Sequence, residues 1–544
     1  MSNQAAKQPS AVLDQAHIGD IRGAFGTIGV NDTGARTNWR ARLVTLLAIM
    51  GPGLIVMVGD NDAGGVSTYA QAGQDFGTSL LWVLALLVPV LIVNQEMVVR
   101  LGLVSGVGHA KLIFARFGKF WGAFSFGDLM ILNLLTIVTE FIGVSLAMQH
   151  FGFSPLVAVG LAALLLIGMT VTGSFRRWER FMYVMVIGNF IAIPMAFLSH
   201  PKVTPMLHGL IPGVQGGFGS SAILLIIGMV GTTVAPWQLF FQQSNVIDKR
   251  LTPRYLSYER LDTVIGSVVV VIGAAAIIAC TAFAFRGTAL FGQFNDAGTV
   301  IAGLTQHVGV LSGDLFAIAL LNASLIGAAA VTLSTSYAIG DVFGSRHSLH
   351  RTLKDGLSFY AAYAVIILVA AGITVIPGAP LGLITTGVQA LAGVLLPSAT
   401  VFLLLLCNDK EVLGPWVNQV WLNVIAIVIV GVLVMLSLIL AATTFFPTVN
   451  VTLLAQTLGI ILLMGLAVVG LIWSRRRQKP STRTLTLVTS REDRFTWRMA
   501  PLDTLERTTW TPVLKMGMLT LRGYLLVAVV MLAVKIVQLA VGGA

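Results

Sequence analysis

The sequence predicts an all-α membrane protein without a sizeable soluble domain. Its 544 residues are 56% hydrophobic and only 10% charged, which is far more apolar than a soluble protein. Apolar runs of about 17 to 25 residues recur along the chain, the length that a helix needs to cross about 30 Å of hydrocarbon. We predict twelve spanning segments and a thirteenth apolar run, which is either spanning or interfacial. They begin near Leu43, Leu80, Phe124, Pro155, Phe181, Ser221, Val264, Leu315, Leu357, Ile384, Val420, Leu453 and Tyr524.

The basic residues are concentrated in alternate loops, although the chain as a whole has a net charge of +11. Loops after the even-numbered segments up to the tenth carry fifteen Lys and Arg residues, whereas the opposite loops carry two, Lys202 and Arg286. This asymmetry is the positive-inside pattern, which places the N-terminus and the even loops in the cytoplasm. We therefore expect a multi-pass protein of a bacterial plasma membrane. Its surroundings are the lipid bilayer, with no nucleic acid and no obligate protein partner.

The segments divide the chain into six regions. We expect a cytoplasmic tail, two five-helix repeats, the peripheral helices 11 and 12, a basic cytoplasmic segment and the last apolar run, at residues 1–41, 42–200, 201–407, 408–474, 475–521 and 522–544. Five is an odd number, so the second repeat begins on the opposite side of the membrane. The two repeats must therefore be inverted relative to each other.

The first segment of each repeat is interrupted at a corresponding point. In segment 1 the interruption is Asp60-Asn61-Asp62-Ala63-Gly64-Gly65, and in segment 6 it lies around Pro236. Proline lacks a backbone donor and displaces a carbonyl, so it readily opens a helix. Paired breaks in two halves are the best sequence indication of a binding site near the middle of the membrane.

The chemistry of these breaks favours a cation. Each first half-helix ends in carbonyls that lack amide partners, at the negative end of its dipole. Asp62 adds a full negative charge at the same level; its alternative role is to cap the restarted helix. Asp60 lies two residues away and points to another face of a helix. We assign it to a candidate ion route.

A series of motifs in a fixed order resembles one family. They are Gly51-Pro52-Gly53-Leu54-Ile55, Asp62-Ala63-Gly64-Gly65, Gln71-Ala72-Gly73, Leu81-Trp82, Arg100-Leu101-Gly102, Arg116-Phe117-Gly118-Lys119 and Glu140-Phe141-Ile142-Gly143. The chain resembles the NRAMP divalent-metal transporters over roughly residues 40–415. The resemblance implies a LeuT-type fold of two inverted five-helix repeats, with the metal held where segments 1 and 6 unwind. It implies a transporter, not an enzyme, whose metal is substrate and not a cofactor.

The same resemblance implies a metal site. Its positions are Asp62, Gly65, Thr232 through its backbone carbonyl, Ala235 and Gln389. Two of them depart from the family, which has a ligating asparagine at Gly65 and a ligating methionine at Ala235. Losing a soft sulfur and two side chains predicts a wider, oxygen-lined site. Such a site suits Mg²⁺, which keeps part of its water, and is similar to the NRAMP-related magnesium transporters. Alternatively, the small residues only pack the helices.

The groups that carry protons in the family are largely replaced. Its segment-6 histidines fall on Trp237 and Gln242, which do not titrate. Glu140 matches a family glutamate and is either a buried structural acid or part of the ion route, to which we also assign Trp237. We therefore predict import of partly hydrated Mg²⁺, and also Mn²⁺, by alternating access without proton coupling. The alternatives are a proton-coupled Mn²⁺ or Fe²⁺ transporter, a cation-coupled amino-acid symporter of the same fold, and a metal sensor.

Overall fold

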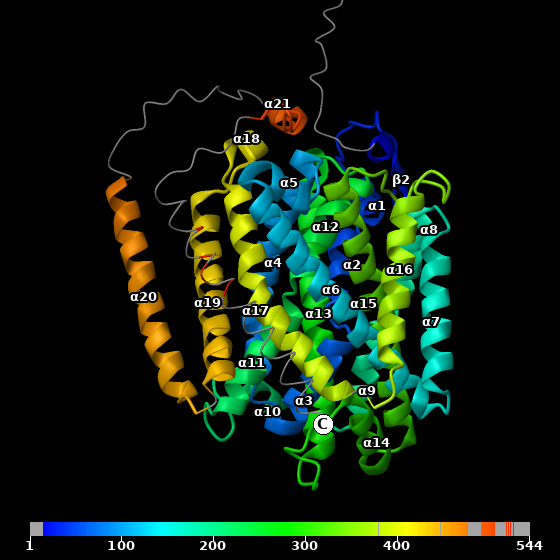
Figure 1. Ribbon diagram of the computed structural model, residues 1–544, viewed down its shortest axis with the longest axis vertical. Coiled ribbons are helices and arrows are strands. Elements are labelled where there is room, and N and C mark those ends of the chain that lie inside the picture. The colour runs from blue at the N-terminus through cyan, green and yellow to red at the C-terminus, as the bar shows by residue number, and fades with distance from the viewer. Residues whose placement is uncertain are drawn as a thin grey trace, which may run out of the picture.

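The computed structural model describes residues 15–378, 380–446, 448–476 and 491–505, with four single positions at 518, 521, 523 and 526. The described chain is mostly helical, and its long helices stand side by side in one bundle (Figure 1). Most of the predicted basic segment 475–521, and nearly all of the last apolar run 522–544, lie outside the described residues.

The two predicted repeats are each built from a broken helix followed by four further segments. The first contains α2 (Pro52–Val58), α3 (Ala63–Phe76), α4 (Leu81–Ser105), α6 (Lys119–His150), α7 (Pro155–Thr170), α8 (Phe175–Gly188) and α9 (Ala192–Leu198). The second contains α11 (Ser220–Thr233), α12 (Pro236–Asp248), α13 (Leu256–Phe285), α15 (Val310–Phe343), α16 (Leu357–Thr374) and α17 (Leu381–Cys407). The peripheral helices are α19 (Val420–Phe445) and α20 (Val451–Arg476). This is the predicted all-α, LeuT-type arrangement.

The helices lie at the predicted positions along the chain, but some of them differ from the prediction in length. Nine helical stretches of the described chain are long and apolar enough to cross a membrane, or ten if one bent pair is counted as a span. Predicted segment 4 is a shorter apolar helix of 16 residues, Pro155–Thr170. Several helices begin earlier than predicted, as α13 does at Leu256, because their polar first turns are helical too.

Segment 1 has a bend that the sequence did not predict. Helix α1 (Trp39–Ile49) meets α2 at an angle of 54°. Between them Gly51 has φ 148°, a conformation that side chains other than hydrogen rarely allow. The Asp262 carboxylate accepts the N–H groups of Gly51 and Gly53 at 2.9 and 2.7 Å, so it caps the start of α2. The broken span therefore consists of α2 and α3, with α1 beside its entrance.

The core and the perimeter use apolar side chains differently. Helices α6 and α15 pack along each other, and α13 packs against α2, α3 and α4. These central helices bury most of the large apolar side chains. Helices α7, α16, α19 and α20 expose theirs, as a lipid-facing surface does; examples are Leu156, Leu164, Leu368, Val424 and Leu463.

The N-terminal region, predicted as a cytoplasmic tail, is folded against the bundle from residue 15 onward. It forms η1 (Gln15–His17) and a small antiparallel pair, β1 (Ile21–Arg22) with β2 (Thr27–Ile28), at the upper end of Figure 1. Its carbonyls accept hydrogen bonds from arginines of the bundle, namely Arg176, Arg180, Arg250 and Arg254. The sequence alone does not reveal this packing, because the arginines that bind the N-terminal region are distant from it along the chain.

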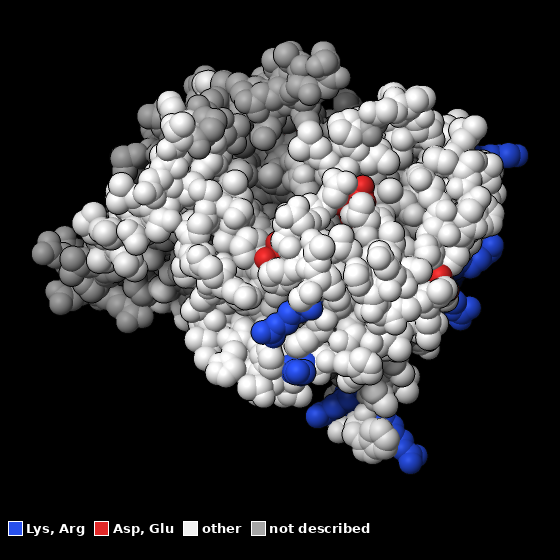
Figure 2. Space-filling model, turned by 90° about the horizontal axis from the view of Figure 1, so that it is seen from below, with Lys and Arg blue, Asp and Glu red and all other residues white. Residues whose placement is uncertain are grey.

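The two ends of the bundle differ in charge. The arginines that bind the N-terminal region lie at the upper end. Figure 2 shows the opposite face end-on, and most of the described surface there is uncharged. The structure thus separates the basic loops from the nearly neutral ones, as the loop charges indicated.

Candidate functional site

The first break lies between α2 and α3, at residues 59–62. The N–H groups of Asp60 and Asn61 donate to carbonyls three residues back, Met57 and Val58, at 3.1 Å each. This tighter turn ends α2. Helix α3 then restarts at Asp62, whose Oδ1 accepts the N–H of Gly65 at 2.7 Å. The capping role considered for Asp62 is therefore confirmed.

The second break lies between α11 and α12. In an unbroken helix the carbonyl of Thr232 would accept the N–H of residue 236, but that residue is Pro236 and has none. Val234 and Ala235 have non-helical backbone, and Ala235 is 6% exposed. The hydroxyl of Thr232 is buried without a hydrogen-bond partner. This break therefore offers a freed carbonyl, a hydroxyl and little side-chain bulk.

Gly65 brings the two breaks together. A Cβ added there would lie 3.3 Å from the Thr232 hydroxyl and 3.4 Å from Asp62 Oδ1. It would also lie 2.5 Å from the backbone carbonyl of Asp60, closer than real Cβ atoms come. The path of the first break therefore requires glycine at 65.

Gln389 of α17 touches both breaks. Its side-chain amide packs so tightly on Gly64 that a Cβ there would overlap it, and its backbone carbonyl lies against Gly231. The Gln389 side-chain nitrogen has no hydrogen-bond partner in the structure. Sequence positions more than 300 residues apart, from Asp62 to Gln389, are thus gathered at one place.

Glu140 of α6 joins the same place. Its Oε2 accepts the N–H of Ala63, the residue after Asp62, at 3.0 Å. Gly327 of α15 makes room for both, because a Cβ there would lie 2.7 Å from the Glu140 carboxyl and 2.8 Å from Asp62 Cβ. Glu140 and Asp62 therefore lie close together beside the first break.

The other two residues of the candidate ion route lie on the side of α2. Asp60 is fully buried; its Oδ1 accepts a hydrogen bond from the Gln238 side chain and its Oδ2 has no partner. The Trp237 indole packs on Gly59, with its N–H unpaired. The sequence analysis missed Gln238 and Gly327. Gln238 could have been found, because a buried amide in an apolar segment is usually functional or paired.

Five buried polar atoms around the breaks have no hydrogen-bond partner among the described residues. They are Asp60 Oδ2, Glu140 Oε1, Thr232 Oγ1, Trp237 Nε1 and Gln389 Nε2. A buried polar atom without a partner costs about 1–3 kcal/mol, so a polar ligand or water at the breaks would be stabilised by these atoms. The described residues contain no group of three or more His, Cys, Asp or Glu that could hold a metal. A cation here would therefore depend on carboxylates, carbonyls and water.

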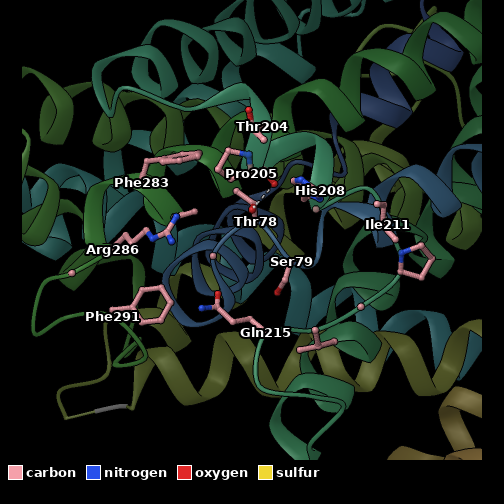
Figure 3. A pocket seen from close by; sticks show the side chains of 17 residues that line it. Thr78, Ser79, Thr204, Pro205, His208, Ile211, Gln215, Phe283, Arg286 and Phe291 are labelled. Carbon is pink, nitrogen blue, oxygen red and sulfur yellow. Dashed lines mark hydrogen bonds between the residues drawn. The ribbon is translucent and has the colours of Figure 1, made fainter.

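The site is enclosed, and a larger cavity lies elsewhere. That cavity, of about 700 Å³, lies at the lower end, beyond the end of α3, among Thr78, His208 and Arg286 (Figure 3). Thr78 donates there to the Pro205 carbonyl at 3.0 Å. Helix α3 separates it from Asp62 by about 20 Å. Asp62 itself is 3% exposed.

The comparisons with known proteins agree with this geometry. The family model described as Nramp, natural resistance-associated macrophage protein-like, matches residues 53–443. The divalent metal cation transporter MntH of Lacticaseibacillus casei (strain BL23) is 26% identical over 74% of this chain and 90% of its own. MntH of Xylella fastidiosa (strain Temecula1) is 26% identical over 80% of this chain and 92% of its own length. The crystal structure of the Eremococcus coleocola manganese transporter has the same fold, with a TM-score of 0.60 and 23% identity over 81% of this chain and 97% of its own. This chain belongs to the Nramp family of divalent metal transporters.

Proposed function

We propose that the protein imports Mg²⁺, and also Mn²⁺, as a partly hydrated ion by alternating access around Asp62. The observation that carries the proposal is the donor set at the two breaks. Asp62 and the freed Thr232 carbonyl present oxygen, Gln389 adds an amide beside them, and Ala235 stands where the family has a ligating sulfur. Oxygen donors without sulfur favour hard divalent ions over soft transition metals.

Small residues at two of the five positions of the proposed metal site favour an ion that keeps part of its hydration shell. Gly65 and Ala235 have no side chains long enough to reach an ion. The two breaks are therefore expected to contact much of the ion through water molecules. Mg²⁺ dehydrates reluctantly and is usually bound by one or two carboxylates and several waters. Mn²⁺ also accepts carboxylate, carbonyl and water ligands, so it should compete.

The membrane potential alone can drive this import. A potential of 100 mV contributes about 2.3 kcal/mol per elementary charge, so about 4.6 kcal/mol for a divalent cation. At about 1.4 kcal/mol per factor of ten, that supports an accumulation of about three orders of magnitude. We accordingly place the basic upper end, with the N-terminal region, in the cytoplasm of a bacterial cell.

Proton-coupled transport of Mn²⁺ or Fe²⁺ is the second candidate. It is favoured by Glu140, a second buried carboxyl group that lies close to Asp62 beside the first break. Trp237 and Gln242, by contrast, offer no group that titrates. An amino-acid symporter is disfavoured, because the N-terminus of α3, where a substrate carboxylate would bind, is already capped by Asp62.

Uptake into liposomes tests the proposal. Purified protein is reconstituted with a pH-sensitive dye inside, and a potential negative inside is imposed. We expect Mg²⁺ to enter, to compete with Mn²⁺ and to leave the internal pH unchanged, while the Asp62→Ala protein takes up neither ion. Acidification that follows metal entry would support the proton-coupled candidate instead. Uptake of Mn²⁺ that excess Mg²⁺ does not reduce would refute the magnesium assignment.

A further inference from the structure

One side-chain amide connects both breaks. Gln238 lies in the first turn of α12 and is fully buried. Its Nε2 donates to the backbone carbonyl of Thr233 at 3.2 Å, beside the second break, and to Asp60 Oδ1 in the first. Its Oε1 accepts from Nε2 of Gln95, on α4, at 2.9 Å. Three separate segments of the chain therefore meet at a single residue.

These partners fix the orientation of the amide. A glutamine amide has two N–H donors on nitrogen and an acceptor oxygen. The Thr233 carbonyl can only accept, so the Gln238 nitrogen must face it, and the same nitrogen lies against Asp60 Oδ1. The Gln95 donor occupies the oxygen side. Flipping the Gln238 amide would set oxygen against oxygen at the two breaks.

The amide also determines what Asp60 presents. The hydrogen bond from Gln238 is the one that the described residues give to the Asp60 side chain, and it engages Oδ1. Asp60 Oδ2 stays buried and unpaired, two residues along the chain from Asp62. A carboxylate held by one oxygen leaves the other oxygen in a fixed place, available to a water molecule or to a cation.

We propose that Gln238 is a positioning residue that determines selectivity among divalent cations. The inference rests on the proposed function. The hydrogen bond from Gln238 to Asp60 Oδ1 orients the free Oδ2 toward the water shell of an ion held by Asp62. The hydrogen bond from Gln238 to the Thr233 carbonyl holds the second break beside the first. Mg²⁺ holds its water more firmly than Mn²⁺ does and makes more of its contacts through water. Losing this arrangement therefore weakens the binding of Mg²⁺ more than the binding of Mn²⁺.

The test compares two identical substitutions on one helix. Gln238→Leu removes the connection, whereas Gln243→Leu is the matched control. Gln243 is equally buried on α12, but its amide bonds the Val107 carbonyl at 2.7 Å and His109 at 2.8 Å, away from the breaks. Both proteins are reconstituted, and KM is measured for Mg²⁺ and for Mn²⁺. Because charge-assisted hydrogen bonds are strong, Gln238→Leu should raise KM for Mg²⁺ about tenfold and for Mn²⁺ about threefold or less.

Gln238→Glu checks the orientation of the amide. It keeps the length of the side chain but places an oxygen against Asp60, so the ratio of the two KM values should move in the same direction. A purely structural role would change the uptake rate of both ions together and leave that ratio as in the wild type. An unchanged ratio in Gln238→Leu, or an equal change in Gln243→Leu, overturns the inference.

The inference can also fail separately from the proposed function. If the wild-type protein takes up Mn²⁺ but no Mg²⁺, the magnesium assignment fails. Calorimetric titration with Mn²⁺ alone then decides the role of Gln238. Weaker Mn²⁺ binding in Gln238→Leu than in Gln243→Leu supports a positioning role, and equal binding refutes it.

Discussion

The two broken helices open for different reasons and bring different chemistry to one place. The first ends in a tight turn and restarts at an aspartate cap, and it holds two buried carboxylates, Asp60 and Asp62. The second opens at Pro236 and has no charged residue between α11 and α12. Inverted repeats thus need not be chemically equivalent. In our account the first break supplies charge, and the second supplies a carbonyl and space.

The largest effect should follow from removing the charge of the first break. Asp62→Ala deletes the carboxylate and also the cap of α3, so we expect uptake of Mg²⁺ and Mn²⁺ to fall at least about a hundredfold, which corresponds to about 2.8 kcal/mol. Asp75→Asn, at the far end of the same helix, is the control and should change uptake less than about twofold. Substantial uptake by Asp62→Ala would contradict the assignment of charge to this break.

The chemistry of the second break can be changed by restoring a sulfur. Ala235→Met should shift the ratio of Mn²⁺ to Mg²⁺ uptake about tenfold toward Mn²⁺, because a thioether is a soft ligand. Ala235→Leu adds similar volume without sulfur and should slow both ions alike. Competition between the two ions in liposomes measures the ratio. Equal ratios in the two variants would show that volume, not sulfur, matters here.

The variant Gln389→Ala tests whether α17 contributes a side chain to the ion position between the breaks. The amide of Gln389 packs on Gly64 and its nitrogen is unpaired, so Gln389→Ala leaves a gap beside the ion position. We expect KM for Mg²⁺ to rise by about three- to tenfold, which corresponds to the loss of one hydrogen bond. Wild-type KM values for both ions would mean that Gln389 only joins helices.

The smallest effect should come from the side chain of Thr232. If the second break contributes a backbone carbonyl, Thr232→Val removes a hydroxyl of no consequence and should change KM less than about twofold. The unpaired hydroxyl of Thr232 makes this a sharp test. A tenfold rise in KM would show that the side chain of Thr232, and not its carbonyl, contacts the ion.

Local features of the sequence predicted much of this fold. The spans follow from apolar length, and both breaks follow from glycine, proline and Asp62. Glu96 and Arg100, four residues apart on α4, form an ion pair at 3.1 Å, as helical spacing allows. The bend at Gly51 and the folded N-terminal region were not predictable, because they depend on Asp262 and on arginines far along the chain. The contact of Glu140 with Asp62 also required the tertiary structure.

Anomalous diffraction from crystals soaked in Mn²⁺ tests the central claim most directly. The account predicts a peak between the two breaks, close to Asp62 and the Thr232 carbonyl and too far from Ala235 for direct contact. Excess Mg²⁺ should reduce that peak. A peak at another cluster of acidic residues, or one at the breaks that Mg²⁺ leaves unchanged, would contradict the account.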